Sequence, residues 1–320
     1  MTNLFNPNMT DMSKLNSMTK YPSILTFHDI DRGILQDQLV TEDGTFPAND
    51  PEIFVTEKVD GTNSRILLFG GDYIIGSREE LLCAKGDRFF NPAQEIVATV
   101  RQLAETLAPS FQNDPFTDDI LFVLYGESYG GNIGKGAKQY SGIHNRGFRV
   151  FDAMILHPQQ VKSLLYTNRE AIAMWRDAGG QKFMTVDDRI EMLRMLPVDM
   201  DSVPYIRKCK LSDIPTDIEG AYNWLCQFRN TNVALDQTGK GQAEGWLSVR
   251  LTALSFASCA SKTTKKPCVS WVSSKSNYVL PLPFRGRLFL YNPEKSIKLS
   301  TSKSTNRFGV TKIPKTVFIF

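Results

Sequence analysis

The alternation of hydrophobic and polar positions divides the chain into a strand-rich part, a helical part and a final strand. Short apolar runs predict strands over residues 53–55, 65–69, 73–77, 120–125, 148–156 and 243–249. Apolar residues at helical spacing predict helices over residues 93–107, 159–178, 186–196 and 214–229. Strands followed by helices favour an α+β domain over alternating βαβ units.

Both ends of the chain depart from this pattern. The first 18 residues contain four methionines among Asn, Thr, Ser and Asp and show no periodicity, so we expect residues 1–20 to be a disordered leader. Met18 is an alternative start of translation. We expect residues 21–250 to form the folded domain and residues 251–320 to be an atypical basic, Ser-rich tail.

Charge changes abruptly at the start of that tail. The net charge of +3 combines 25 Lys and Arg against 33 acidic residues before position 251 with 12 against 1 after it. We find no apolar run long enough for a membrane span and no signal peptide. The five cysteines are scattered without metal-ligand spacing, which favours free thiols and a cytosolic protein.

The strongest chemical signal is Glu57-Lys58-Val59-Asp60-Gly61-Thr62-Asn63, which follows a predicted strand. A strand-end lysine before a sharp glycine turn can present its amine as a nucleophile. Lys-x-Asp-Gly arises by chance in roughly one chain in ten to twenty of this length, so alone it does not separate a nucleophile from an ordinary Asp-Gly turn.

Other charged or aromatic residues occur at later strand ends. In chain order these are Ser77-Arg78, Tyr125-Gly126-Glu127, Phe151-Asp152 and Glu244-Gly245. Each one alone fits ordinary sheet architecture, and Phe151 could be a core residue. Together with Lys58 they suit a site that binds a nucleoside triphosphate and attacks its α-phosphate.

In this order the segments resemble motifs I, Ia, III, IIIa and IV of the covalent nucleotidyltransferases, which comprise ATP-dependent ligases and mRNA capping enzymes. Thr62-Asn63, the run from Tyr125 to Gly131, and Lys135-Gly136 look most like RNA ligases of phages and bacteria. The resemblance covers about residues 20–250. It implies an ATP-grasp-like adenylyltransferase domain of antiparallel sheets flanked by helices.

The resemblance also implies a role for each matched residue. Lys58 would become adenylylated by ATP, with Glu244 acting near Mg²⁺ or the lysine. Glu127 would bind the ribose hydroxyls and Phe151 would stack on the adenine. The remaining candidates are Arg78 for ribose or the RNA-end phosphate, Glu57 for the adenine amino group, and Asp60 with Gly61 for the phosphate site. AMP would then pass to a 5′-phosphate RNA end, which a 3′-hydroxyl seals.

Two competing chemistries fit less well. Residues 130–136 (GGNIGKG) resemble a P-loop but are one residue short between the glycines and lack the Ser or Thr that binds Mg²⁺, so we expect a flexible basic loop. The three histidines, His28, His144 and His157, show no metal-ligand spacing.

The family pattern breaks after Arg250, where a strand with two basic residues (motif V) is expected and LTALSFASCASKTTKKP follows. A frameshift explains this absence and the change in composition. One codon spelling of Ser255 through Pro267, read from its third base, gives Leu-Arg-Lys-Leu-Arg-Phe-Glu-Asp-Tyr-Glu-Lys-Thr, which resembles motif V. We therefore expect the tail to add no strands to the core, and this chain to be impaired as an enzyme.

Two alternatives remain open. An ATP-dependent DNA ligase would need an appended OB-fold, which residues 251–320 do not supply. A non-catalytic nucleic-acid-binding protein would use the basic tail alone. The expected partners are RNA ends or nicks and no membrane, and the sequence leaves the oligomeric state open.

Overall fold

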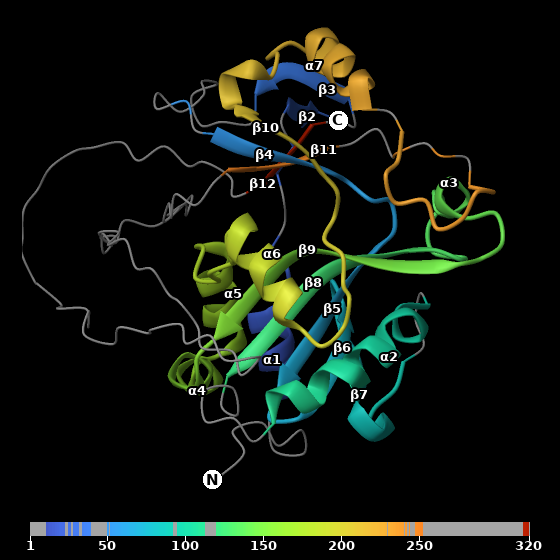
Figure 1. Cartoon of the computed structure of the whole chain (residues 1–320). Helices are drawn as coiled ribbons and strands as arrows, with labels where there is room; N and C mark the ends of the chain where they lie inside the picture. Colours follow the sequence, from blue (N-terminus) through green and yellow to red (C-terminus); the bar gives the residue numbers. More distant parts are fainter. Residues whose placement is uncertain are drawn as a thin grey trace, which may run out of the picture.

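The structure is a computed structural model that describes residues 11–22, 25–26, 28–31, 34–39, 50, 52–91, 95–112, 120–228, 230–239, 241, 243, 247–251 and 316–319. Two five-stranded sheets form its framework (Figure 1). The described helices pack around them, which confirms the α+β class and the antiparallel sheets.

The first sheet is antiparallel throughout and has the order β7-β6-β5-β8-β9. Its strands are β5 (Thr62–Phe69), β6 (Asp72–Ser77), β7 (Leu81–Ala84), β8 (Leu121–Gly130) and β9 (Arg146–Leu156). Gly70 and Gly71 join β5 to β6 with φ values of 50° and 78°. Glycine adopts this left-handed conformation without steric cost, which confirms the predicted hairpin.

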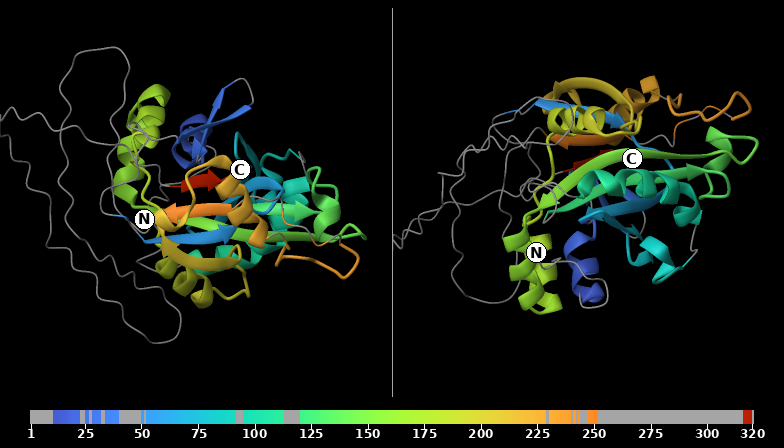
Figure 2. Two further views of the ribbon diagram at one scale, coloured as in Figure 1. Left: turned by 90° about the horizontal axis from the view of Figure 1, so that it is seen from above. Right: turned by 60° about the horizontal axis from the view of Figure 1, so that its bottom comes forward.

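The second sheet has the order β1-β12-β11-β4-β10 and lies over β8 and β9 of the first (Figures 1 and 2). Its strands are β1 (Leu25–Thr26), β4 (Glu52–Glu57), β10 (Tyr205–Lys210), β11 (Leu247–Leu251) and β12 (Thr316–Ile319). All its pairings are antiparallel except β1 with β12. A separate hairpin pairs β2 (His28–Asp31) with β3 (Ile34–Leu39).

Helices cover both faces of the first sheet. The α-helices are α1 (Met12–Thr19), α2 (Ile96–Leu107), α3 (Ala137–Tyr140), α4 (Pro158–Tyr166), α5 (Arg169–Asp177), α6 (Val186–Met195) and α7 (Ile218–Leu225). Short 3₁₀ turns occur at Lys85–Asp87, Ala108–Phe111, Leu211–Asp213 and Cys226–Phe228. Because successive strand residues point to opposite faces, β5 contributes to two separate cores.

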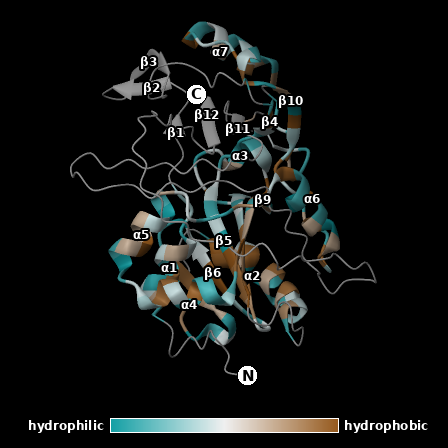
Figure 3. Ribbon diagram, turned by 90° about the vertical axis from the view of Figure 1, so that its left-hand side faces the viewer, coloured by the Kyte–Doolittle hydropathy of each residue, from teal (hydrophilic) through white to brown (hydrophobic). Residues whose placement is uncertain are grey.

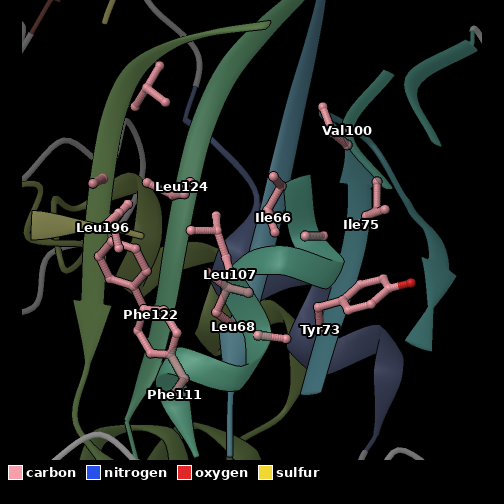
Figure 4. Close-up of a cluster of buried hydrophobic side chains, with 14 of the residues drawn as sticks. Ile66, Leu68, Tyr73, Ile75, Val100, Leu107, Phe111, Phe122, Leu124 and Leu196 are labelled. Atoms are coloured by element: carbon pink, nitrogen blue, oxygen red, sulfur yellow. The ribbon is translucent and has the colours of Figure 1, made fainter. Parts of the chain in front are cut away.

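One core lies between the first sheet and helices α2 and α6 (Figure 4). It contains Ile66 and Leu68 of β5 with Val100 and Leu107 of α2. The other core lies between the opposite face and helices α1, α4 and α5, and takes Leu67 and Phe69 from the same strand. Hydrophobic residues accordingly gather in the strands between the helices (Figure 3).

The expectation of a disordered leader is wrong for residues 12–19, which form α1. The Asp11 carboxylate caps this helix by accepting hydrogen bonds from the backbone N–H groups of Ser13 and Lys14. Leu15 and Met18 are buried against the sheet. The helix has eight residues, and this length is too short for periodicity to reveal a helix.

Three other expectations need correction. The helix expected over 159–178 is two helices, because Asn168 caps the start of α5 by accepting from the backbone N–H of Ala171. Strand β10 was not expected. The tail adds one strand to the second sheet, since the β-branched and aromatic residues of β12 pair with β11. Residues 252–315 lie outside the described residues.

Candidate active site

Lys58 lies where the chain passes from one sheet to the other. Strand β4 of the second sheet ends at Glu57, and β5 of the first sheet begins at Thr62. Lys58 is half-buried, whereas its neighbours Glu57 and Val59 are 2% and 3% exposed. The turn of residues 58–61, which we call the crossover turn, therefore presents this amine at the junction of the two sheets.

The crossover turn packs directly on β8. A Cβ atom at Gly61 would lie 2.2 Å from the carbonyl oxygen of Ser128, so a residue with a side chain does not fit there. The backbone N–H of Asp60 donates to the Tyr140 hydroxyl at 2.6 Å. These contacts fix the backbone of the crossover turn and therefore the position of Lys58.

The glycine-rich loop 130–136 packs on the same turn. A Cβ atom at Gly136 would lie 2.0 Å from the Oδ2 atom of Asp60, and one at Gly134 would lie 3.7 Å from its Oδ1 atom. Ile133 is buried, and Lys135 is exposed between the two glycines. The expected flexible basic loop is thus a packed one that brings Lys135 beside the crossover turn.

Polar residues form a row across three strands next to the crossover turn. Asn63 of β5 pairs with Glu127 of β8, and Glu127 pairs with Arg149 of β9. Directly paired residues point to the same face of a sheet, so these three side chains share one face. Arg149 also forms an ion pair with Asp201, with Nη1 and Oδ2 2.5 Å apart.

Phe151 is the extra residue of a β-bulge in β9. Tyr125 of β8 pairs with Asp152, and the next residue, Gly126, pairs with Val150. Phe151 therefore has no partner in the ladder between β8 and β9. Tyr125 and Phe151 both pack with the core of α1, α4 and α5, whereas Val150 packs with the opposite core. A bulge redirects a side chain in this way, and bulges are frequent beside active sites.

A small apolar cluster brings the Phe151 ring close to the crossover turn. The cluster contains Val59, Tyr129, Tyr140, Val203 and Val233, with Phe151 and Leu235 packed against it. Burial raises the pKa of the Tyr129 phenol, which therefore stays protonated near neutral pH. Because Val59 follows Lys58 directly, the cluster joins the predicted nucleophile to the predicted base-stacking residue.

Glu57 is engaged by the protein itself. Its Oε2 atom accepts from the backbone N–H of Asn232 at 2.8 Å and from the Nδ2 of Asn232 at 3.3 Å. Its Oε1 atom accepts from the hydroxyl of Thr231 at 2.5 Å. The carboxylate thus anchors residues 231–232 to the end of β4. Its contact with an adenine amino group stays a prediction without a contact in its favour.

Arg78 stands at the same end of the first sheet, one strand away from the crossover turn. It follows Ser77, the last residue of β6, and Ser77 pairs with Ser64 of β5. The Arg78 side chain is exposed, and its Nε atom lies 3.9 Å from Oε1 of Glu79. The exposed Arg78 side chain is therefore accessible to a ligand at this end of the sheet.

Glu244, the candidate for metal binding and catalysis, lies outside the described residues, as does the rest of its motif up to Trp246. In the part of the chain that the structure describes, no group of three His, Cys, Asp or Glu side chains is arranged to hold a metal ion. His144 contacts the carbonyl of Gly131, and His157 caps α4. Both therefore have structural positions.

Sequence analysis did not identify the interactions that hold β9 on either side of Val150. Arg189 is 2% exposed, and its Nη1 atom donates to the carbonyl oxygen of Phe151 at 2.5 Å. It shares the buried side of α6 with Val186, Met192 and Leu193. An arginine on an apolar helix stripe is a signal that the sequence contained. No comparable signal marked the ion pair of Arg149 with Asp201, because 52 positions separate its partners along the chain.

Comparison with known families defines the class of this site. Residues 51–248, from β4 to β11, match the model of the RNA ligase family. This segment includes the crossover turn and every predicted site residue. The chain belongs to the RNA ligase family. No curated protein sequence matches it.

Several solved structures of Naegleria gruberi RNA ligase are similar to this chain. A lysine-to-alanine mutant with ATP and Mn is 14% identical, with a TM-score of 0.41 over 65% of this chain and 48% of that one. An aspartate-to-alanine mutant in the apo form is 13% identical, with a TM-score of 0.42 over 74% and 55%. The chain thus spans about half the length of these structures. Among the described residues, no helix has the length and apolar character to cross a membrane.

Proposed function

We propose that this protein is an ATP-dependent RNA ligase that works through a lysyl-AMP intermediate at Lys58. The Lys58 amine attacks the α-phosphorus of ATP, the N–P bond forms, the bond to the β-phosphate breaks, and pyrophosphate leaves with its electrons. A 5′-phosphate of RNA then attacks the same phosphorus and releases the lysine. Finally a 3′-hydroxyl attacks the activated 5′-phosphate, and AMP departs.

The crossover turn is the observation that carries this proposal. A nucleophile needs a fixed backbone and an open side for the substrate. The contacts of Gly61 with Ser128 and of Asp60 with Tyr140 supply the fixed backbone. The junction between the sheets and the half-buried state of Lys58 supply the open side.

The nucleoside would bind along the face that carries Glu127 and Phe151. Glu127 would accept hydrogen bonds from the ribose hydroxyls, in a row where Arg149 and Asn63 flank it. Phe151 would stack on the adenine, since its bulge separates it from the ladder that fixes its neighbours. Arg78 would hold the ribose or the phosphate of the RNA end.

Mg²⁺ fits the chemistry of this site, because it commonly binds through one or two carboxylates together with substrate phosphates. Asp60 offers a carboxylate in the crossover turn, and Glu244 would offer the second. When bound, Mg²⁺ would neutralise charge on the phosphates. In this scheme Asp60 and Gly61 shape the phosphate site, and Lys135 adds positive charge from the adjacent loop.

We also propose that residues 251–320, which include β12, are read out of frame and that this chain is therefore weakly active. The support is the change from 33 acidic residues before position 251 to one after it, and the missing motif V. Without the motif V lysine the α-phosphate lacks a neutralising contact, which would slow attack by Lys58.

Labelling with ATP tests the proposed intermediate. Wild-type protein should retain label from [α-³²P]ATP but not from [γ-³²P]ATP, and Lys58→Ala should retain neither. Lys162→Ala is the matched control, because Lys162 is an exposed lysine on α4. If Lys58→Ala still carried the α-label, the assignment of the nucleophile would be wrong.

Sealing assays test the substrate. Because the chain belongs to the RNA ligase family, RNA nicks or RNA ends should be sealed in preference to DNA nicks, with a weak overall rate in this chain. Preferential sealing of DNA would favour a DNA ligase instead. If there were neither covalent labelling nor sealing even with the reading frame restored, a non-catalytic nucleic-acid-binding protein would be favoured.

A further inference from the structure

The Phe151 ring rests on an aromatic side chain from the N-terminal segment. The rings of Phe151 and Tyr21 meet edge to face, with centroids 5.1 Å apart and an interplanar angle of 76°. Such contacts favour one orientation of the two rings. Because the bulge removes Phe151 from the ladder, a side contact of this kind has an unusually direct effect on where its ring points.

Tyr21 is itself held in a single place. It is 6% exposed, and its hydroxyl donates to the Oδ2 atom of Asp152 at 3.0 Å. Its ring also lies 5.1 Å from that of Tyr125 and 5.2 Å from that of Phe183. Asp152 follows Phe151 in β9, so Tyr21 contacts both the bulged residue and the residue after it.

The backbone before Tyr21 is anchored by the side chains of Gln181 and Tyr125. The buried Gln181 donates from Nε2 to the carbonyl oxygens of Met18 and Lys20, both at 3.0 Å. The Tyr125 hydroxyl donates to the carbonyl oxygen of Thr19 at 2.8 Å. These three bonds hold the end of α1 and fix the direction in which the chain approaches Phe151.

A buried arginine of β5 also anchors α1. The Arg65 guanidinium is fully buried and donates to the carbonyl oxygen of Asn16 and to the hydroxyl of Thr19, both at 3.2 Å. Burial lowers the pKa of Arg65 to about 10, and the group still stays charged at neutral pH. A buried charge needs such partners, so α1 and the sheet depend on each other.

We propose that Tyr21 is a positioning residue for nucleotide binding, which orients Phe151 so that its ring meets the base. The N-terminal segment of residues 12–22 is then part of the nucleotide site although it precedes the region that matches the family. This inference rests on the proposed function, because it requires Phe151 to stack on the adenine.

A double-mutant cycle on nucleotide affinity tests the inference. The probe is α,β-methylene-ATP, which cannot transfer AMP to Lys58, and its dissociation constant is measured by calorimetry. Phe151→Ala should weaken binding about tenfold to a hundredfold. Tyr21→Ala should weaken it about three- to tenfold, the range expected for an aromatic pair. In the Phe151→Ala background, Tyr21→Ala should have no further effect.

Conservative and distant variants separate positioning from general destabilisation. Tyr21→Phe keeps the ring and should bind within about twofold of wild type. Tyr73→Ala is the matched control, because Tyr73 is also buried, has its hydroxyl bonded to Glu105, and lies in the opposite core. It should lower the melting temperature without changing the affinity. Tyr21→Leu replaces Tyr21→Ala if the latter does not fold.

The outcomes distinguish the two claims. Additive effects of Tyr21→Ala and Phe151→Ala would overturn the positioning role, as would an unchanged affinity in Tyr21→Ala while Phe151→Ala binds weakly. An unchanged affinity in Phe151→Ala would instead remove Phe151 from the nucleotide site. No binding by the wild-type protein would overturn the proposed function together with this inference.

Discussion

The substitution Gly61→Ala should reduce the rate of Lys58 adenylylation much more than it reduces the stability of the fold. In Gly61→Ala the new Cβ atom would lie 2.2 Å from the carbonyl oxygen of Ser128, whereas real Cβ contacts are essentially never shorter than 3.0 Å. The backbone must therefore move by about 0.8 Å. Overpacking of this kind costs about 1–3 kcal/mol of stability. A displacement near 1 Å of a reacting group can reduce the rate about a hundredfold.

The assay compares thermal unfolding with the rate of Lys58 labelling by [α-³²P]ATP. Gly61→Ala should lose much more labelling than its modest loss of stability explains. Gly86→Ala is the control, because its φ of 71° strains any side chain while no atom lies within 4 Å of the new Cβ. It should cost about 1–2 kcal/mol of stability and leave labelling unchanged. Wild-type labelling in Gly61→Ala would refute the claim that this contact positions the nucleophile.

The remaining predictions concern the N-terminal helix, the carboxylate of Asp236 and the tail. Leu15→Ala should lower the free energy of unfolding by about 2–5 kcal/mol in a urea titration, because Leu15 is 1% exposed; a negligible loss would mean that α1 does not dock. Hydrogen bonds from Ser141 and Thr238 hold the pKa of Asp236 below its ordinary value, so its stabilisation is present above about pH 4 and lost as the pH falls further. Hydrogen exchange of residues 230–239, corrected for intrinsic rates, should rise on acidification in wild type but not in Asp236→Asn. Restoring the reading frame near the codon for Arg250 should increase adenylylation; a gene whose codons forbid the shifted reading would contradict the frameshift.

Strands and helices with a repeating apolar pattern could be predicted from the sequence. A single irregularity within a strand, such as a β-bulge, could not. The strand that precedes Lys58 and the strand that leads to Glu127 were evident, since buried strands leave long apolar runs. The bulge at Phe151 was not, because a register shift depends on the partner strand and leaves no mark on the period of two. Phe151 was therefore identified as a candidate from its motif alone. The bulge that redirects its side chain is visible only in the structure.

The site illustrates the same limit. The order of motifs indicated Lys58, Asp60, Glu127 and Phe151 as neighbours. In the structure the crossover turn leads into β5, where Asn63 pairs with Glu127, whereas Phe151 lies inside β9, two residues after the partner of Glu127. The order of motifs could not indicate Tyr21, whose contacts with Tyr125, Phe151 and Asp152 each join residues more than 100 positions apart. Long-range contacts between unlike residue types leave no local signal, which is why the N-terminal segment was expected to be disordered.

The docking of α1 also sets an order of events during synthesis. Its anchors lie far downstream: Tyr21 bonds to Asp152 across 131 positions, and Met18 bonds to Gln181 across 163. At translation rates of about 5–20 residues per second, the partners Asp152 and Gln181 are synthesised roughly ten to thirty seconds after α1. Contacts of such high sequence separation also form slowly. During that interval the apolar side of α1 is uncovered and available to a chaperone. Helix α1 is thus synthesised before its partners and reaches its final position after them.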